Sequence, residues 1–204
     1  MNGFDRLAPF YDKLTRFVFG KSMIEAQTVF FDRVQSKDRV LILGGGTGWI
    51  LVELLKQRPD CEVWYVDSSM RMIAMAKEKC GIHANVHFIV GTEQQLPVIK
   101  FDLVIMNFFL DLFTEDHIVP LLKRVRLVTK PRGLWVVTDF EDEGKWWQKS
   151  LLKVMIWFFR WMCNIEARRL PALPIILQRE SAKSCETRSF FHGFIKARLL
   201  TLSN

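Results

Sequence analysis

Short apolar runs alternate with longer amphipathic stretches along most of this chain. The runs are rich in β-branched and aromatic residues and cover residues 40–43, 63–66, 86–90, 103–106 and 134–138. Because nearly every position in them is apolar, they are typical of strands that are covered on both faces. Their alternation with helical patterns predicts an α/β fold around a parallel sheet.

Helical periodicity follows the strands over residues 47–56, 69–79 and 114–128, and Thr114 is placed to cap the last of these helices. Two further helices are expected before the first strand, at 4–19 and 22–34, on either side of Gly20. After the last strand the pattern predicts helices at 145–163 and 170–183. The tail then reads as two strands that turn at His192-Gly193, an antiparallel hairpin at the end of the sheet.

Length and composition favour one compact domain. The chain has 204 residues, of which 50% are hydrophobic and 25% charged. We expect a single domain over 1–204, made of a helical cover (1–34), a core (35–140), a helical insertion (141–169) and a final helix with hairpin (170–204). Four scattered cysteines and the lack of a secretory signal pattern predict a cytoplasmic protein with free thiols.

The net charge of +7 is concentrated at one end of the chain. Residues 1–144 hold 18 Lys or Arg and 19 Asp or Glu, whereas residues 145–204 hold 11 and 3. Such asymmetry is typical of proteins that contact nucleic acid, an anionic membrane surface or an acidic substrate. It carries no information about the fold.

A glycine turn, Gly44-Gly45-Gly46-Thr47-Gly48, lies between the first strand and the helix after it. This position requires a tight turn and a close approach of backbone to ligand. A dinucleotide fingerprint would need a third glycine where Trp49 stands, and a P-loop would need Lys-Ser or Lys-Thr after the glycines. The spacing is therefore G-x-G-x-G, and the alternative is an ordinary turn without ligand.

Asp67 ends the second strand about twenty residues after the glycines, where a carboxylate can accept hydrogen bonds from both ribose hydroxyls. By itself, an aspartate before Ser68 and Ser69 is more typical of a helix N-cap than of a ligand contact. The strand and the spacing favour the ligand role.

Together with two further segments, these features resemble the class I S-adenosylmethionine-dependent methyltransferases, and among them the ubiquinone/menaquinone branch. The segment from Asp67 to Met70 resembles the family's D-x-S-x-x-M. Residues 91–97 resemble G-D-A-x-x-L-P, and Phe4-Asp5 with Tyr11-Asp12 resembles F-D-x-x-A-x-x-Y-D. The likeness covers residues 1 to about 140.

The resemblance implies a Rossmann-like, doubly wound, mostly parallel seven-stranded sheet with an antiparallel C-terminal hairpin, and S-adenosylmethionine as cofactor. It implies that the cofactor is bound by Tyr11, Gly44, Gly45, Gly46, Gly48, Asp67, Ser68, Met70, Thr92, Glu93, Asn107 and Phe108. Two positions depart from the family. Thr92 replaces an aspartate that bonds the adenine amino group, and Leu43 stands where an acid often precedes the first glycine.

Candidate general bases are Asn107, Asp111, Asp139 and His117, which follow or lie near the carboxyl ends of the fourth and fifth strands. N-capping or exposure explains each of them equally well. The segment after the fourth strand is not an N-P-P-Y or D-P-P-Y box, which argues against methylation of exocyclic amines on nucleobases or glutamine. No metal site is predicted.

The segment 145–163 combines four of the seven tryptophans with Lys145, Lys149, Lys153 and Arg160 near one stripe of the helix. This composition favours an interfacial helix or a lid over an apolar acceptor. A core helix packed on the sheet is the alternative. Its most apolar run, residues 151–163, is only a little over a dozen residues long and contains two of these cations, whereas a transmembrane helix takes ~20 predominantly apolar residues.

We therefore expect methyl transfer to a hydrophobic small molecule, with peripheral membrane contact through 145–163. A nucleic-acid methyltransferase is one alternative, but the C-terminal helix is too apolar for such a surface and no RNA-binding module is present. A non-catalytic binding protein of the same fold is the other. The oligomeric state and the acceptor atom do not follow from the sequence.

Overall fold

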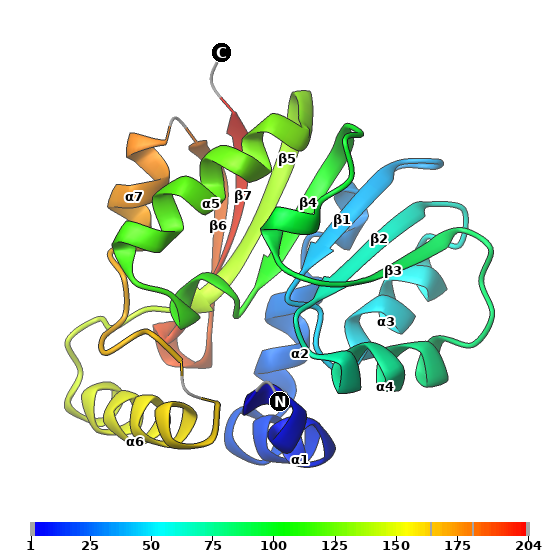
Figure 1. Cartoon of the computed structure of the whole chain (residues 1–204). Helices are drawn as coiled ribbons and strands as arrows, with labels where there is room; N and C mark the ends of the chain where they lie inside the picture. Colours follow the sequence, from blue (N-terminus) through cyan, green and yellow to red (C-terminus); the bar gives the residue numbers. More distant parts are fainter. Residues whose placement is uncertain (1–2, 164, 181, 203–204) are drawn as a thin grey trace.

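A computed structural model describes residues 3–163, 165–180 and 182–202, apart from the side chains of 9–13 and 16. Seven strands form one sheet in the order β3-β2-β1-β4-β5-β7-β6 (Figure 1). The first five strands along the chain pair in parallel, whereas β7 pairs antiparallel with both β5 and β6. The predicted mostly parallel sheet with an antiparallel end is confirmed.

Each of the five predicted apolar runs lies within a strand; β3 coincides with its run, and the other four strands are longer than theirs. The strands are β1 (Arg39–Leu43), β2 (Glu62–Asp67), β3 (Val86–Val90), β4 (Phe101–Asn107), β5 (Thr129–Phe140), β6 (Ala182–Phe190) and β7 (Ile195–Leu202). The helices are α1 (Gly3–Phe19), α2 (Lys21–Thr28), α3 (Trp49–Gln57), α4 (Met70–Cys80), α5 (Glu115–Val128), α6 (Trp146–Cys163) and α7 (Leu173–Arg179). Short 3-10 turns lie at Phe31–Arg33, Glu93–Gln95, Leu110–Leu112 and Phe191–Gly193.

Successive residues of each central strand enter opposite cores. Val40 and Ile42 of β1 pack in the cluster that contains α3 and α4 residues, whereas Leu41 and Leu43 pack in the cluster that contains α5 and α7 residues. A strand with a helical layer on each face buries both sets of side chains, which is why these runs are almost entirely apolar.

A third cluster closes the end of the sheet where the parallel strands terminate. It joins Phe19 and Met23 of the N-terminal helices to Phe140 of β5, Leu152 of α6 and Phe194 before β7. Figure 1 shows α1 and α6 close together at this end, and residues of the two helices contact each other. Segments from both ends of the chain therefore cover the same edge of the sheet.

Three details differ from the sequence expectations. The helix expected at 22–34 ends at Thr28 and is followed by a 3-10 turn. The helix expected at 170–183 is confined to Leu173–Arg179, because Lys183 pairs with Thr201 in the β6–β7 ladder. Thr114 occupies the N-cap position of α5 but its side chain makes no capping hydrogen bond.

Position 45 requires a glycine because of side-chain packing and not because of its backbone conformation. A Cβ atom placed on it would lie 2.2 Å from Cζ of Tyr65, whose ring is buried between the glycine turn and Phe88. The hydroxyl of Tyr65 donates to the carbonyl of Gly46 at 3.1 Å, so the ring cannot move away without losing this bond.

Gly45→Ala is expected to lower the free energy of unfolding by about 1 to 3 kcal/mol, because the added methyl overpacks the core at Tyr65. Urea denaturation of Gly45→Ala, Tyr65→Leu and the double variant measures this. We expect the double variant to lose less stability than the two single losses summed, since the smaller side chain relieves the overlap. Additive losses would contradict a contact between the two positions.

Candidate active site

The glycine turn and Asp67 form one hydrogen-bonded unit. Gly44, Gly46 and Gly48 have φ values of 63°, 69° and 91°, so the G-x-G-x-G spacing places a glycine at each left-handed position of the turn. The N–H of Gly46 donates to Oδ2 of Asp67 at 2.9 Å. Among the described residues, apart from its two chain neighbours, none has an atom within 4 Å of where a Cβ of Gly46 would be, so this side of the turn is open.

Asp67 is buried at the end of β2, with 9% of its surface exposed. Its other oxygen, Oδ1, accepts from the N–H of Ser69 at 2.8 Å. Burial raises the pKa of the Asp67 carboxyl, while the Ser69 and Gly46 amides oppose the increase and the nearby Asp5 adds to it. A carboxylate has about four lone-pair positions, so two remain for ligand hydroxyls.

A cavity of about 240 Å³ opens at these residues. Seven of the predicted cofactor-binding residues line it, namely Gly44, Gly46, Asp67, Ser68, Thr92, Glu93 and Phe108. They come from the loops after β1, β2, β3 and β4, which end at the same edge because the strands are parallel. Gly45 and Gly48 do not line it: Gly45 packs on Tyr65 and Gly48 on Ala76.

Thr92 and Glu93 differ in what remains free for a ligand. The Thr92 hydroxyl accepts from the Gln94 N–H at 3.2 Å, and the Gln95 side chain accepts from the Thr92 N–H at 2.7 Å in a capping box. The hydroxyl is therefore engaged in the 3-10 turn. Glu93 is 8% exposed and lines the cavity, which makes it the better placed acceptor of the two.

Met70 and Tyr11 are not placed at the cavity by the structure. Met70 is the first residue of α4 and is 71% exposed, whereas Met72, two residues later, is buried and lines the cavity. Tyr11 lies on α1, and its side chain is outside the part of the chain that the structure describes.

The N-terminal helix is fixed over the cavity through Asp5. The hydroxyl of Ser69, which also caps α4 by accepting from the Met72 N–H, donates to Oδ1 of Asp5 at 2.5 Å. Arg71 donates its side chain to the Asp5 carbonyl at 3.3 Å. This contact places the adjacent Phe4 against the cavity.

A smaller cavity of about 50 Å³ adjoins the larger one. The two share Phe4, Phe108, Leu112 and Ile165 as lining residues. The inner face of α6 contributes Leu152, Met155, Ile156 and Phe159. Among the described residues that line it, Asp111 alone is polar, so this cavity is apolar with a single carboxyl group in its wall.

Phe108 stands between the two cavities with a left-handed backbone, φ 50°. Its N–H donates to the Thr138 carbonyl at 2.6 Å, and its ring packs 4.7 Å from that of Phe140. This conformation is unfavourable for a residue with a Cβ and is held here by the surrounding contacts. Backbone strain of this kind is concentrated at ligand-binding and catalytic sites.

Asp111, which is half-buried, and the fully buried Asp139 form a carboxyl pair beside the smaller cavity. Oδ1 of Asp111 and both carboxyl oxygens of Asp139 have no hydrogen-bond donor among the described residues, and Asp139 is 0% exposed. Burial raises the pKa of Asp111 to about 6, although the neighbouring Asp139 carboxyl acts in the opposite direction. Burial and the charge of Asp111 raise the pKa of Asp139 well above its usual range.

The pair therefore titrates as a unit and shares one proton at neutral pH. Ionisation of one carboxyl disfavours ionisation of the other, because the two groups lie together where water is largely excluded. Arg198 is the cation that acts on Asp139 from outside the pair.

The other two candidate bases lie elsewhere. Asn107 is turned toward α2, where its Nδ2 donates to the Gln27 carbonyl at 3.3 Å, and it lines neither cavity. Nδ1 of His117 lies 3.0 Å from Oε2 of Glu166, whose residue lines the larger cavity, but the imidazole itself does not reach that lining. The placement of Asn107 as a cofactor contact is thus not supported by its geometry.

Sequence reasoning missed several lining residues. Met72 lines the larger cavity, and Leu112 and Ile165 line both. The direction of the Met72 and Leu112 side chains depends on how their helical turns are rotated, and Ile165 lies in the segment after α6. Phe4 could have been predicted as a lining residue, since it belongs to the N-terminal F-D motif.

A methyltransferase domain model matches residues 40–133 of the chain. The chain is 30% identical to a demethylmenaquinone methyltransferase of Thermotoga maritima over 68% of its own length, and 32% identical to a malonyl-[acyl-carrier protein] O-methyltransferase of Halalkalibacterium halodurans over 50%. It spans 60% and 38% of the length of these two curated relatives.

The fold is also similar to that of a solved structure, the 1,6-didemethyltoxoflavin-N1-methyltransferase of Burkholderia thailandensis, with a TM-score of 0.73. The likeness covers 99% of this chain and 87% of the other at 16% identity. At this identity the comparison shows a common fold.

Asp111→Asn is expected to stabilise the folded protein at pH 7 by roughly 1 to 3 kcal/mol, since a pKa increase of about two units means that the ionised carboxyl is disfavoured in the fold. A raised pKa makes wild-type stability fall as pH rises from about 4 through 6. The gain of the variant should therefore vanish below pH 4. Thermal unfolding between pH 4 and 7.5 measures it, with the exposed Asp116→Asn as control; a gain independent of pH would contradict the shared proton.

Proposed function

Because this chain belongs to the class I S-adenosylmethionine-dependent methyltransferase family, we propose that it transfers the methyl group of S-adenosylmethionine to a hydrophobic small molecule. One observation carries the proposal: the cavity at the glycine turn and Asp67 shares a wall with a second, apolar cavity that contains one carboxyl group. Donor and acceptor could then meet at the shared wall without intervening bulk water.

The larger cavity fits the donor. The open space beside Gly46 leaves room for a ligand against the backbone, and the remaining lone pairs of Asp67 are suited to two vicinal ribose hydroxyls. Glu93 can accept from the adenine amino group, the task that an aspartate performs at the position of Thr92 in related sequences. Met72 would pack on the adenine ring in place of Met70.

S-adenosylmethionine supplies an electrophilic methyl group on a sulfonium, so the protein mainly holds donor and acceptor in a reactive geometry. The smaller cavity would orient an apolar acceptor by contact with Phe108, Leu112 and Phe4. Asp111 would accept the proton that the acceptor oxygen or nitrogen loses as it bonds to the methyl carbon. Asp139, whose own ionisation the Asp111 charge disfavours, would remain protonated beside it.

Asp67→Asn is expected to weaken binding of S-adenosylhomocysteine at least ~10-fold, because the amide provides fewer acceptor positions than the carboxylate. Isothermal titration calorimetry measures the affinity. Glu78→Gln, a change of the same kind on the exposed face of α4, should leave it unchanged. Gly46→Trp, which would fill the open side of the turn, is a second test; unchanged affinity in both folded variants would refute the donor site.

Asp111→Asn is expected to reduce methyl transfer by roughly 10²-fold or more, the usual contribution of a general base. The assay uses tritiated S-adenosylmethionine with a panel of phenols, hydroquinones and aryl amines. The wild-type rate should rise as pH increases through about 6, as Asp111 loses its proton. Affinity for S-adenosylhomocysteine should not change; equal rates for wild type, Asp111→Asn and the control Asp116→Asn would exclude a role as base.

A further inference from the structure

Helix α6 has two faces of different character, and only the inner one is used by the fold. Trp147 packs in edge-on and tilted contacts with Phe191 and Phe194, Leu152 is buried, and Met155 and Phe159 line the smaller cavity. On the other face Trp146, Trp157 and Trp161 are 80%, 68% and 70% exposed. Three of the seven tryptophans of the chain therefore face solvent from one helix.

The same exposed face is positively charged. Lys149, Lys153 and Arg160 are exposed on α6, which contains no acidic residue. In the described part of the chain none of these three cations has a carboxylate within ion-pair distance. Arg168 and Arg169, shortly after the helix, extend the exposed positive charge.

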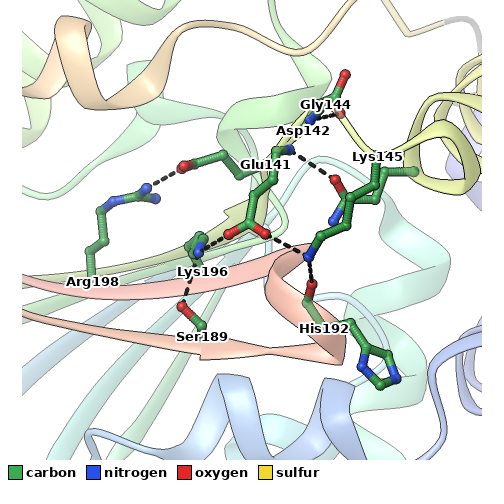
Figure 2. Close-up of polar contacts among 10 residues, drawn as sticks. Glu141, Asp142, Gly144, Lys145, Ser189, His192, Lys196 and Arg198 are labelled. Carbon is green, nitrogen blue, oxygen red and sulfur yellow. Dashed lines mark hydrogen bonds and ion pairs between the residues drawn. The ribbon is translucent and has the colours of Figure 1, made fainter.

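The orientation of α6 is set by contacts at its beginning (Figure 2). Glu143 accepts from Lys196 at 2.5 Å and from Lys145 at 2.9 Å, and Lys145 also donates to the His192 carbonyl at 2.7 Å. The hydrogen bonds from Lys196 and Lys145 lower the pKa of Glu143 to about 2. The Glu143 N–H donates to the buried Gln148 at 2.9 Å, so the first turn of α6 is tied to the β6–β7 hairpin with Trp146 outward.

We propose that the outer face of α6, formed by Trp146, Lys149, Lys153, Trp157, Arg160 and Trp161, binds the surface of an anionic lipid bilayer. Indole rings favour the interface between headgroups and acyl chains, and lysine and arginine beside them are attracted to anionic headgroups. No helix of the described chain is long and apolar enough to cross a membrane. The contact is therefore peripheral, with α6 parallel to the surface.

The positive charge of this face favours an anionic bilayer over a second copy of the chain. Two α6 helices placed face to face would bring six cations together, and the helix offers no acid to compensate them. An anionic surface compensates all of them at once. Nucleic acid is also anionic and is treated below as an outcome of the test.

The position of α6 connects this surface to the proposed reaction, and this step rests on the proposed function. The residues of α6 that line the smaller cavity lie on the opposite side of the same helix from the outer face. An acceptor dissolved in the bilayer would then reach the cavity around α6 without entering bulk water. The acceptor class that follows is a membrane-soluble lipophile with an ionisable O–H or N–H group.

Vesicle flotation tests the surface without reference to catalysis. The full chain is mixed with phosphatidylcholine vesicles, with or without phosphatidylglycerol, at low and at high salt. We expect binding to the anionic vesicles that weakens with salt, and at least tenfold weaker binding to phosphatidylcholine alone. Absence of binding to anionic vesicles at low salt would overturn the proposal.

Two α6 variants separate the apolar from the electrostatic contribution. Trp157→Ala/Trp161→Ala and Lys149→Glu/Lys153→Glu should each reduce vesicle binding at least tenfold, with unchanged melting temperature because all four side chains are exposed. The matched controls, Leu127→Ala and Lys123→Glu/Arg124→Glu on the exposed face of α5, should bind as wild type. Equal loss in the controls, or no loss in the α6 variants, would contradict a specific face.

Competing partners give different results. Retention of single-stranded RNA or DNA that exceeds vesicle binding and is lost in the same α6 variants would replace the lipid proposal by a nucleic-acid surface. A dimer by light scattering that dissociates in Trp157→Ala/Trp161→Ala would replace it by self-association. Vesicle binding together with failure to bind S-adenosylhomocysteine would leave the surface intact and refute only the methyl-transfer function.

Discussion

The hydrogen bond from the Gly46 amide to the Asp67 carboxylate is the contact from which the rest of the site is organised. It joins the loops after β1 and β2, and the second oxygen of Asp67 extends the connection to the Ser69 amide at the start of α4. Ser69 then binds Asp5, which holds α1 and its Phe4 over both cavities. A single buried carboxylate thus couples the glycine turn, two strands and the N-terminal cover.

Asp67 and the Asp111–Asp139 pair have opposite environments. Asp67 accepts a backbone N–H on each oxygen, so its charge is stabilised locally despite burial. By contrast, Oδ1 of Asp111 and both carboxyl oxygens of Asp139 have no hydrogen-bond partner among the described residues, and ionisation of one carboxyl disfavours ionisation of the other. Unsatisfied buried carboxyls reduce stability, and their presence at an apolar cavity is the pattern expected of groups retained for chemistry.

Helix α6 serves two environments at once because its first turn is fixed. The contacts of Glu143 and Gln148 set the rotation of the helix about its axis, and this rotation decides which side chains enter the smaller cavity and which face outward. The fixed rotation of α6 therefore places its apolar residues at the cavity and three of its tryptophans, which the core does not use, at the surface.

The sequence by itself determined the alternation of strands and helices, the glycine positions and the location of Asp67 at a strand end. These depend on local periodicity and backbone conformation, which neighbouring residues specify. The sequence predicted the ends of helices less well. Helix α7 is shorter than the expected 170–183 because Lys183 pairs with β7, and local sequence patterns do not encode such a long-range contact.

Only the tertiary structure decided which polar groups meet. Asp111 and Asp139 are close because β4 and β5 pair with Asn107 opposite Thr138. Asp5 contacts Ser69 although the two residues are 64 positions apart in the sequence. The same register turns Asn107 toward α2, and helix phase exposes Met70 while burying Met72. Side-chain direction at strand and helix ends depends on register and rotation, and long-range packing sets both.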